Sequence, residues 1–219
     1  MRLSNTSRRR GAVGSLVSSL PIHPFVENRM HRTLTLIGLA LLLSTSATQA
    51  VAQGKSTKAH KIANAMTAAP RSISGKAAIM DWPATDGAQM TTLRTGTNGW
   101  TCLPDFPSTK GNDPMCVDDQ WLGFMGAMMT KATPKVSHAG IGYMVAPGGG
   151  AYGSNTDPYA TKATAGNEWG FDPPHVMLLV TDPSALAGIP TSRQSGGPWV
   201  MWRGTPYAHI MIPLASTKK

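Results

Sequence analysis

The segment 197–213 limits the possible folds of this chain more than any other stretch, because it has the pattern of two strands joined by a turn. Apolar runs rich in β-branched and aromatic residues flank Gly204-Thr205-Pro206, which predicts a β-hairpin. The second arm, 207–213, is similar to the earlier stretch 174–180, since both contain His, an aliphatic residue and Met in that order. Side chains two positions apart on a strand point to the same face, so each His is expected beside its Met.

Two helices and one helical turn are expected elsewhere. Apolar residues at helical spacing predict a helix over 58–69, ended by Pro70, and a second helix that begins at Asp118-Asp119 and ends before Pro134. An Asp at the start of a helix accepts free backbone N–H groups, which supports the second prediction. Asp182-Pro183 predicts a single helical turn.

Short extended segments fill the rest of the pattern. Strands are expected at 76–82, 89–94, 100–103, 139–146 and 175–180. The Asn-Gly turn within 95–99 predicts that the second and third of these pair as a hairpin. The segment 147–174 is expected to be a long loop. The fold class predicted is α+β, with a mostly antiparallel sheet of about six or seven short strands, one medium helix and short helical turns.

Residues 30–52 have the three parts of a secretory signal peptide: a basic start, an apolar run at 34–43 and an Ala-x-Ala cleavage signal ending at Ala52. The apolar run has about 11 residues, whereas a membrane-spanning helix needs about 20, so a retained anchor is disfavoured. Residues 1–29 are interpreted as an over-extended start or a leader. A twin-arginine signal is the alternative, although Arg8 to Arg10 lie far before the apolar run. We therefore expect one mature domain, 53–219, secreted or periplasmic after cleavage near Ala52.

The chain has two cysteines, Cys102 and Cys116. An even pair in an exported protein favours a disulfide. Such a crosslink would restrict the unfolded chain by roughly 3 kcal/mol, because it closes a loop of this length. A redox or metal pair would need the Cys-x-x-Cys spacing, which the sequence lacks.

The formal net charge of +9 would by itself suggest a polyanionic partner. Much of that charge lies in the leader, because residues 53–219 hold 14 Lys and Arg against 10 Asp and Glu. No block of five or six basic residues occurs in this part, so we expect no nucleic-acid partner. No transmembrane segment is expected in the mature chain. The sequence does not identify a partner, and both a small molecule and a protein are compatible with it.

Four motifs are distinctive: 96–104 (GTNGWTCLP), 113–116 (DPMC), 155–159 (NTDPY) and 204–211 (GTPYAHIM). Together they resemble a family of uncharacterised secreted bacterial proteins, and the resemblance covers most of residues 57–213. No activity is known for that family. The resemblance therefore implies secretion and transfers no catalytic or binding residue.

The first functional hypothesis is an exported protein that acts as a binding or structural module without catalysis. The sequence has no Gly-x-Ser-x-Gly elbow, His-Glu-x-x-His zinc helix, phosphate loop or dinucleotide fingerprint. In this hypothesis an apolar ligand would occupy a pocket lined by Trp202, Tyr207 and Met128.

The second hypothesis is a copper site. If the two His-x-Met strands are neighbours, the side chains that would converge on one face are His175, Met177, His209 and Met211. Imidazole together with thioether suits copper, particularly Cu(I). The competing interpretation is an ordinary sheet, in which Met fills irregular space and each His bonds to a backbone carbonyl.

The third hypothesis is a hydrolase with a histidine base. The candidate bases are His138, His175 and His209, the candidate orienting acids are Asp157 and Asp172, and the candidate nucleophiles are Ser154 and Thr205. Nothing in the spacing of these residues requires the roles, and Asp before Pro commonly opens a turn. No catalytic residue is therefore assigned.

Overall fold

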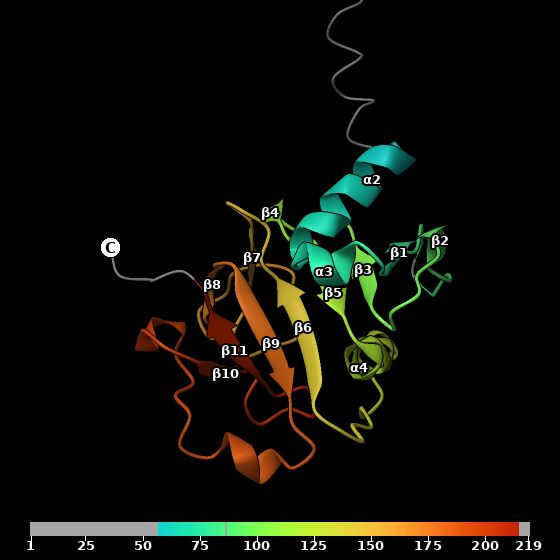
Figure 1. Cartoon of the computed structure of the whole chain (residues 1–219). Coiled ribbons are helices and arrows are strands. Elements are labelled where there is room, and N and C mark those ends of the chain that lie inside the picture. Colours follow the sequence, from blue (N-terminus) through green and yellow to red (C-terminus); the bar gives the residue numbers. More distant parts are fainter. Residues whose placement is uncertain (1–56, 86, 215–219) are drawn as a thin grey trace, which may run out of the picture. The chain divides into compact units, whose positions relative to one another are not determined.

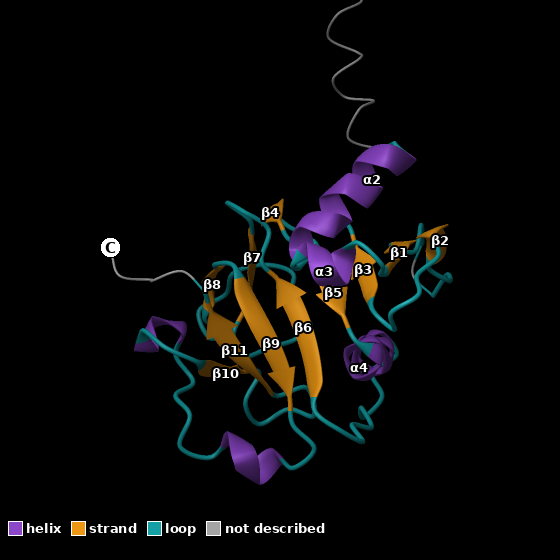
Figure 2. Cartoon of the chain, viewed as in Figure 1, coloured by secondary structure: helices purple, strands orange, loops and turns teal. Residues whose placement is uncertain are grey.

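The structure is a computed structural model that describes residues 57–85 and 87–214, and its strands form two sheets (Figures 1 and 2). The predicted leader at 1–29 and signal peptide at 30–52 lie outside the described residues. The strands are β1 Ala78–Asp81, β2 Thr91–Arg94, β3 Thr101–Leu103, β4 Gly111–Asn112, β5 Met115–Val117, β6 Gly140–Met144, β7 Gly150–Ser154, β8 Trp169–Asp172, β9 His175–Leu179, β10 Trp199–Met201 and β11 His209–Pro213.

Sheet A contains eight strands in the order β10-β11-β9-β6-β5-β3-β1-β2, and sheet B contains β4-β7-β8. All neighbours in both sheets run antiparallel except β1 and β3, which run parallel. The α+β class is confirmed. The prediction of six or seven strands is too low, because it missed β5 in sheet A and all of sheet B.

The described helical elements are α2 Lys58–Ala65, η1 Met66–Ala68, α3 Arg71–Ser74, α4 Asp119–Met129, η2 Pro183–Leu186 and η3 Arg193–Ser195. The predicted first helix is confirmed as α2 continued by η1, and it ends before Pro70. The predicted second helix is α4, whose N-cap residue Asp118 accepts a hydrogen bond from the backbone N–H of Trp121. The helical turn after Asp182 is η2.

Two predictions about strand connections are wrong. Strands β2 and β3 do not form a hairpin, because β1 lies between them in sheet A. The connection 95–100 passes so close to β1 that a Cβ added to Gly96 would lie 2.0 Å from the nitrogen of Ala78. The predicted loop 147–174 also contains β7 and β8, which pair antiparallel with Ser154 opposite Trp169. By contrast, the C-terminal hairpin is confirmed, with Val200 of β10 opposite Ile210 of β11.

Alternation along the strands gives sheet A two different faces. One face carries the largest core, on which α4 and β7 pack; its buried members are Leu103, Val117, Trp121, Phe124, Met125, Met144, Met177, Leu179, Trp199, Met201, Tyr207 and Met211. The other face carries two smaller clusters. One lies under α2 and η1, around both cysteines, and Figure 1 shows α3 beside β3 and β5, with α2 above it in the view. The other includes Leu186 of η2, Val200 and Ile210.

Candidate functional site

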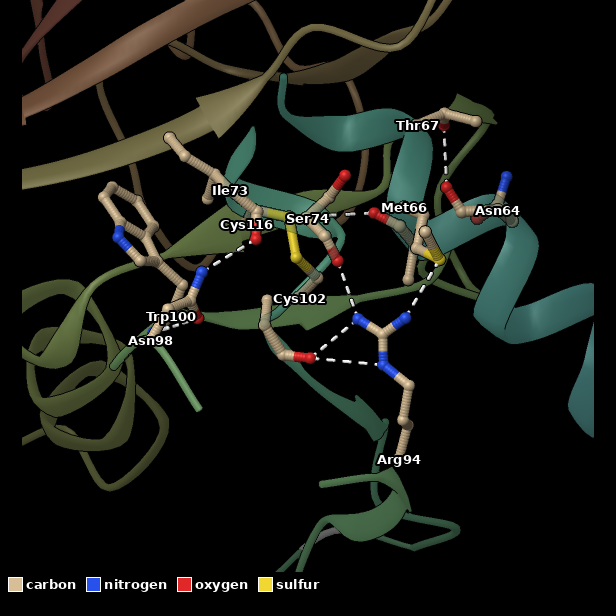
Figure 3. Close-up of a disulfide and its surroundings, with 12 residues drawn as sticks. Asn64, Met66, Thr67, Ile73, Ser74, Arg94, Asn98, Trp100, Cys102 and Cys116 are labelled. Carbon is tan, nitrogen blue, oxygen red and sulfur yellow. Dashed lines mark hydrogen bonds between the residues drawn. A yellow bond between two sulfur atoms is a disulfide. The ribbon is translucent and has the colours of Figure 1, made fainter. Parts of the chain in front are cut away.

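Cys102 and Cys116 form a disulfide, which confirms the predicted pair (Figure 3). The two residues lie directly opposite each other on β3 and β5, and both are fully buried. The Sγ of Cys116 lies 3.8 Å from the carbonyl oxygen of Ala65, at the end of α2. Figure 3 shows Arg94 beside the disulfide, donating hydrogen bonds to the Ser74 carbonyl and to the sulfur of Met66. This burial shields the bond from thiols in solution, so it is a brace for the fold.

The two His-x-Met segments lie on neighbouring strands, β9 and β11, as the copper hypothesis requires. Met177 and Met211 are directly opposite each other. Because the strands are antiparallel, His175 and His209 lie at opposite ends of this methionine pair. All four side chains belong to one face of sheet A, and none is more than 6% exposed.

Sequence reasoning missed two further methionines on this face. Met201 of β10 lies directly opposite His209, and Met144 of β6 lies directly opposite His175. Both methionines are buried. Each histidine therefore has one methionine across the strand pair and another two positions along its own strand. The alternation in 140–144 and 199–201 predicts the face of each Met, but the order of the strands is a property of the whole fold.

Hydrogen bonds determine which ring nitrogen of each buried histidine carries the proton. Nδ1 of His175 lies 2.6 Å from the carbonyl oxygen of Pro173, and Nδ1 of His209 lies 2.9 Å from that of Tyr207. A carbonyl oxygen only accepts, so Nδ1 donates and Nε2 of each neutral ring keeps a free lone pair. Burial lowers the pKa of both histidines to about 4, although the carbonyl contacts raise it. Among the described residues, both Nε2 atoms and Nε1 of Trp121 are buried without a hydrogen-bond partner.

Aromatic side chains surround the ring of His209. The ring centroids of Trp121 and Trp202 lie 5.1 and 5.0 Å away, and that of Phe124 lies 6.1 Å away, all in edge-to-face geometry. Gly142 makes room for this packing, because a Cβ there would lie 2.8 Å from Cε of Met177 and 3.5 Å from the Trp121 ring. Met177 and Trp121 therefore pack together on the side of the sheet that carries His209.

Within residues 57–85 and 87–214, no three His, Cys, Asp or Glu side chains group so that they could hold a metal ion. A zinc or calcium site made of such ligands is therefore not supported in this part of the chain. Thioethers are outside that ligand set. The face that carries the two histidines and their four methionines, called the His–Met face below, offers imidazole and thioether, a ligand set that suits soft metals such as Cu(I).

The three residues of the predicted ligand pocket pack and form hydrogen bonds within the protein. Nε1 of Trp202 donates to the carbonyl of Ser154 at 2.8 Å. The hydroxyl of Tyr207 donates to the backbone carbonyl of Ala132 and lies 2.7 Å from the hydroxyl of Tyr159. The Tyr159 hydroxyl also lies within hydrogen-bond distance of the backbone carbonyl of Met128. None of the three lines either of two surface cavities, of about 340 and 230 Å³. The ligand pocket stays a prediction.

The candidate nucleophiles and one candidate acid hold loops in place. Oγ of Ser154 donates to the carbonyl of Asn167 and accepts from the N–H of Asp157. The carboxylate of Asp157 accepts a hydrogen bond from the backbone N–H of Tyr159. Oγ1 of Thr205 donates to the carbonyl of Trp202. These contacts place no candidate nucleophile beside a candidate base.

The candidate base His138 is exposed. Its Nε2 lies 3.6 Å from Asp119, and its Nδ1 lies 3.2 Å from Oγ of Ser137. Solvent screens a contact between two such exposed groups, so it orients the ring weakly. The other candidate bases, His175 and His209, point Nε2 into the core, away from solvent.

The candidate acid Asp172 forms a buried ion pair instead. Its Oδ1 lies 2.9 Å from Nε of Arg193, and Arg193 also donates to the carbonyl of Glu168 at 2.7 Å. Both Glu168 and Arg193 line the cavity of about 340 Å³. Burial raises the pKa of Asp172 to about 6, although Arg193 lowers it.

This raised pKa predicts a pH-dependent contribution to stability. Between pH 3.8 and about 6 the folded chain holds a proton on Asp172 that the unfolded chain has released, so acidification through this range stabilises the fold. The wild type should gain about 2 kcal/mol relative to Asp172→Asn when the pH falls from 7 to 4.5. Urea denaturation of both proteins at the two pH values measures this gain.

The comparison with the variant removes effects that both proteins share, including those of Asp113, whose pKa burial also raises to about 6, and of the two buried histidines. The quantity that decides is the free energy of unfolding of the wild type minus that of Asp172→Asn. If this difference is the same at both pH values, or is larger at pH 7 than at pH 4.5, the prediction is wrong.

The fold and the site define an α+β protein with a buried disulfide and a His–Met face. Comparison with family models, with curated protein sequences and with solved structures finds no match to this chain. The resemblance to secreted bacterial proteins therefore stays a prediction. Among the described residues, no helix is long and apolar enough to cross a membrane.

Proposed function

We propose that this chain is an exported protein, braced by one disulfide, that binds a ligand or partner or serves as a structural module without catalysing a reaction. The observation that supports the noncatalytic role is that the candidate nucleophiles and acids are engaged in hydrogen bonds and an ion pair within the fold. Ser154, Asp157, Thr205 and Asp172 all hold segments of the fold together. The disulfide supports export, because such bonds persist mainly in oxidising compartments.

Intact-mass spectrometry of the protein from its native exported fraction tests the location. A denatured mass that begins at Gln53 and lies 2 Da below the reduced value is the expected result. Recovery of the protein only in the cytoplasm, uncleaved and with free thiols, would overturn the proposal of export.

A broad panel of hydrolase substrates tests the noncatalytic role. We expect no turnover above that of the buffer. Turnover that disappears in a variant of a single candidate residue, such as Ser154→Ala or His138→Ala, would establish catalysis and overturn this part of the proposal.

A further inference from the structure

We propose that the face of sheet A around His209 binds one Cu(I) ion through Nε2 of His209 and the thioethers of Met177, Met201 and Met211. The inference deepens the binding role proposed above, on which it rests, because it names the class of ligand. The juxtaposition that carries it is a buried histidine nitrogen without a partner among neighbouring methionines.

The nitrogen of His209 is arranged as a metal ligand. Its Nδ1 proton is held by the carbonyl of Tyr207, which orients the ring and leaves the lone pair of Nε2 free. A backbone carbonyl bonded to the second ring nitrogen is the usual support of a histidine that binds a metal. Leaving a buried acceptor unpaired is costly, so this position favours a ligand that binds the lone pair.

The methionines supply the remaining ligands. Met201 lies opposite His209 in β10, Met211 lies two positions along β11, and Met177 lies opposite Met211 in β9. One histidine nitrogen with three thioether sulfurs is a soft, uncharged ligand set. Such a set selects Cu(I) over Zn²⁺, which is bound by thiolate, imidazole and carboxylate.

The dry, aromatic surroundings of His209 suit a monovalent cation. The rings of Trp121 and Trp202 lie within 5.1 Å of the His209 ring, and aromatic rings attract cations in a desolvated site. Phe124 and Ala208 line the surface cavity of about 230 Å³, Phe124 packs against His209, and Ala208 precedes it in the chain. The cavity thus reaches the aromatic layer that covers the histidine.

The second histidine does not belong to this site. His175 lies at the far end of the methionine pair and is flanked by Met144. It has the same bond from Nδ1 to a carbonyl and the same unpaired Nε2, but within the described part of the chain no aromatic ring packs against it as Trp121 and Trp202 pack against His209. Methionines flank both histidines in the same way, so we assign the ion to the His209 end because, among the described residues, only there do the rings of Trp121 and Trp202 enclose the histidine.

Anaerobic titration with Cu(I), in competition with the chelator bicinchoninate, tests the site in the purified protein with its disulfide intact. The wild type should withdraw one equivalent of Cu(I) and show quenched tryptophan fluorescence. Replacing three methionines together (Met177→Leu, Met201→Leu, Met211→Leu) should weaken Cu(I) binding at least tenfold while preserving apolar volume. His209→Phe should weaken it similarly. Met80→Leu is the matched control, because β6, β5 and β3 separate Met80 from β9.

Each outcome decides the inference. A wild type that takes up no Cu(I), or a folded triple variant that binds as tightly as the wild type, would show that the methionines only fill the core. A cleaved, exported protein without Cu(I) uptake would overturn this inference alone. Cu(I) uptake by a protein that stays uncleaved in the cytoplasm would overturn export and leave the metal site standing.

Discussion

Replacing both cysteines with alanine is expected to lower the free energy of unfolding by about 3 to 4 kcal/mol, measured by urea denaturation. The bond between Cys102 and Cys116 closes a loop with a sequence separation of 14, which restricts the unfolded chain. Both side chains are also fully buried, so their loss removes packing in the cluster beneath α2. For a domain of this size the midpoint of thermal unfolding should fall by about 10 °C.

The reduced wild type is the control for this prediction. Unfolding and refolding the wild type in reductant should bring its stability close to that of the double alanine variant, while reductant should not change the variant. If the variant is as stable as the oxidised wild type, the disulfide would not be the brace that we infer.

The C-terminal hairpin and α4 could be predicted because their signals are local, and the disulfide could be predicted because the chain has only two cysteines. An Asp at position 118 satisfies free N–H groups at the start of a helix whatever the rest of the chain does. The hairpin β10-β11 likewise needs only two apolar runs and a turn.

Pairings between distant segments could not be predicted in this way. The turn at 95–99 has the residues of a hairpin, yet β1 takes the place between β2 and β3. Strand β7 contains two glycines and an alanine, a composition with weak strand propensity, and pairing with β4 and β8 decides its structure.

In the candidate site, too, the features that depend on local sequence could be predicted and those that depend on strand order could not. Period-two alternation is enough to place His209 and Met211 on one face of a strand. The neighbour relation between β9 and β11 depends on strand order, and so does the position of Met201 beside His209. The unpaired Nε2 depends in addition on the carbonyl of Tyr207 and on the rings that exclude water.

Gly96→Ala is expected to have the largest effect of any single substitution considered, a loss of about 4 kcal/mol or more, or failure to fold. A Cβ at this position would lie 2.0 Å from the nitrogen of Ala78 and 2.6 Å from the carbonyl carbon of Ala77. Both are backbone atoms of the segment that leads into β1, so no side chain can move to relieve the clash. Relief would require separating 95–97 from β1 and breaking the bond from the N–H of Thr97 to the carbonyl of Lys76.

Gly123→Ala is the matched control, because it makes the same chemical change on the exposed side of α4, where a Cβ would meet nothing within 4 Å. Alanine favours a helix over glycine, so this variant should be more stable than the wild type by about 0.5 to 1 kcal/mol. Urea denaturation of the two variants should therefore shift in opposite directions. A Gly96→Ala protein with wild-type stability would mean that the connection 95–100 does not pass against β1, and the order of strands in this half of sheet A would then be wrong.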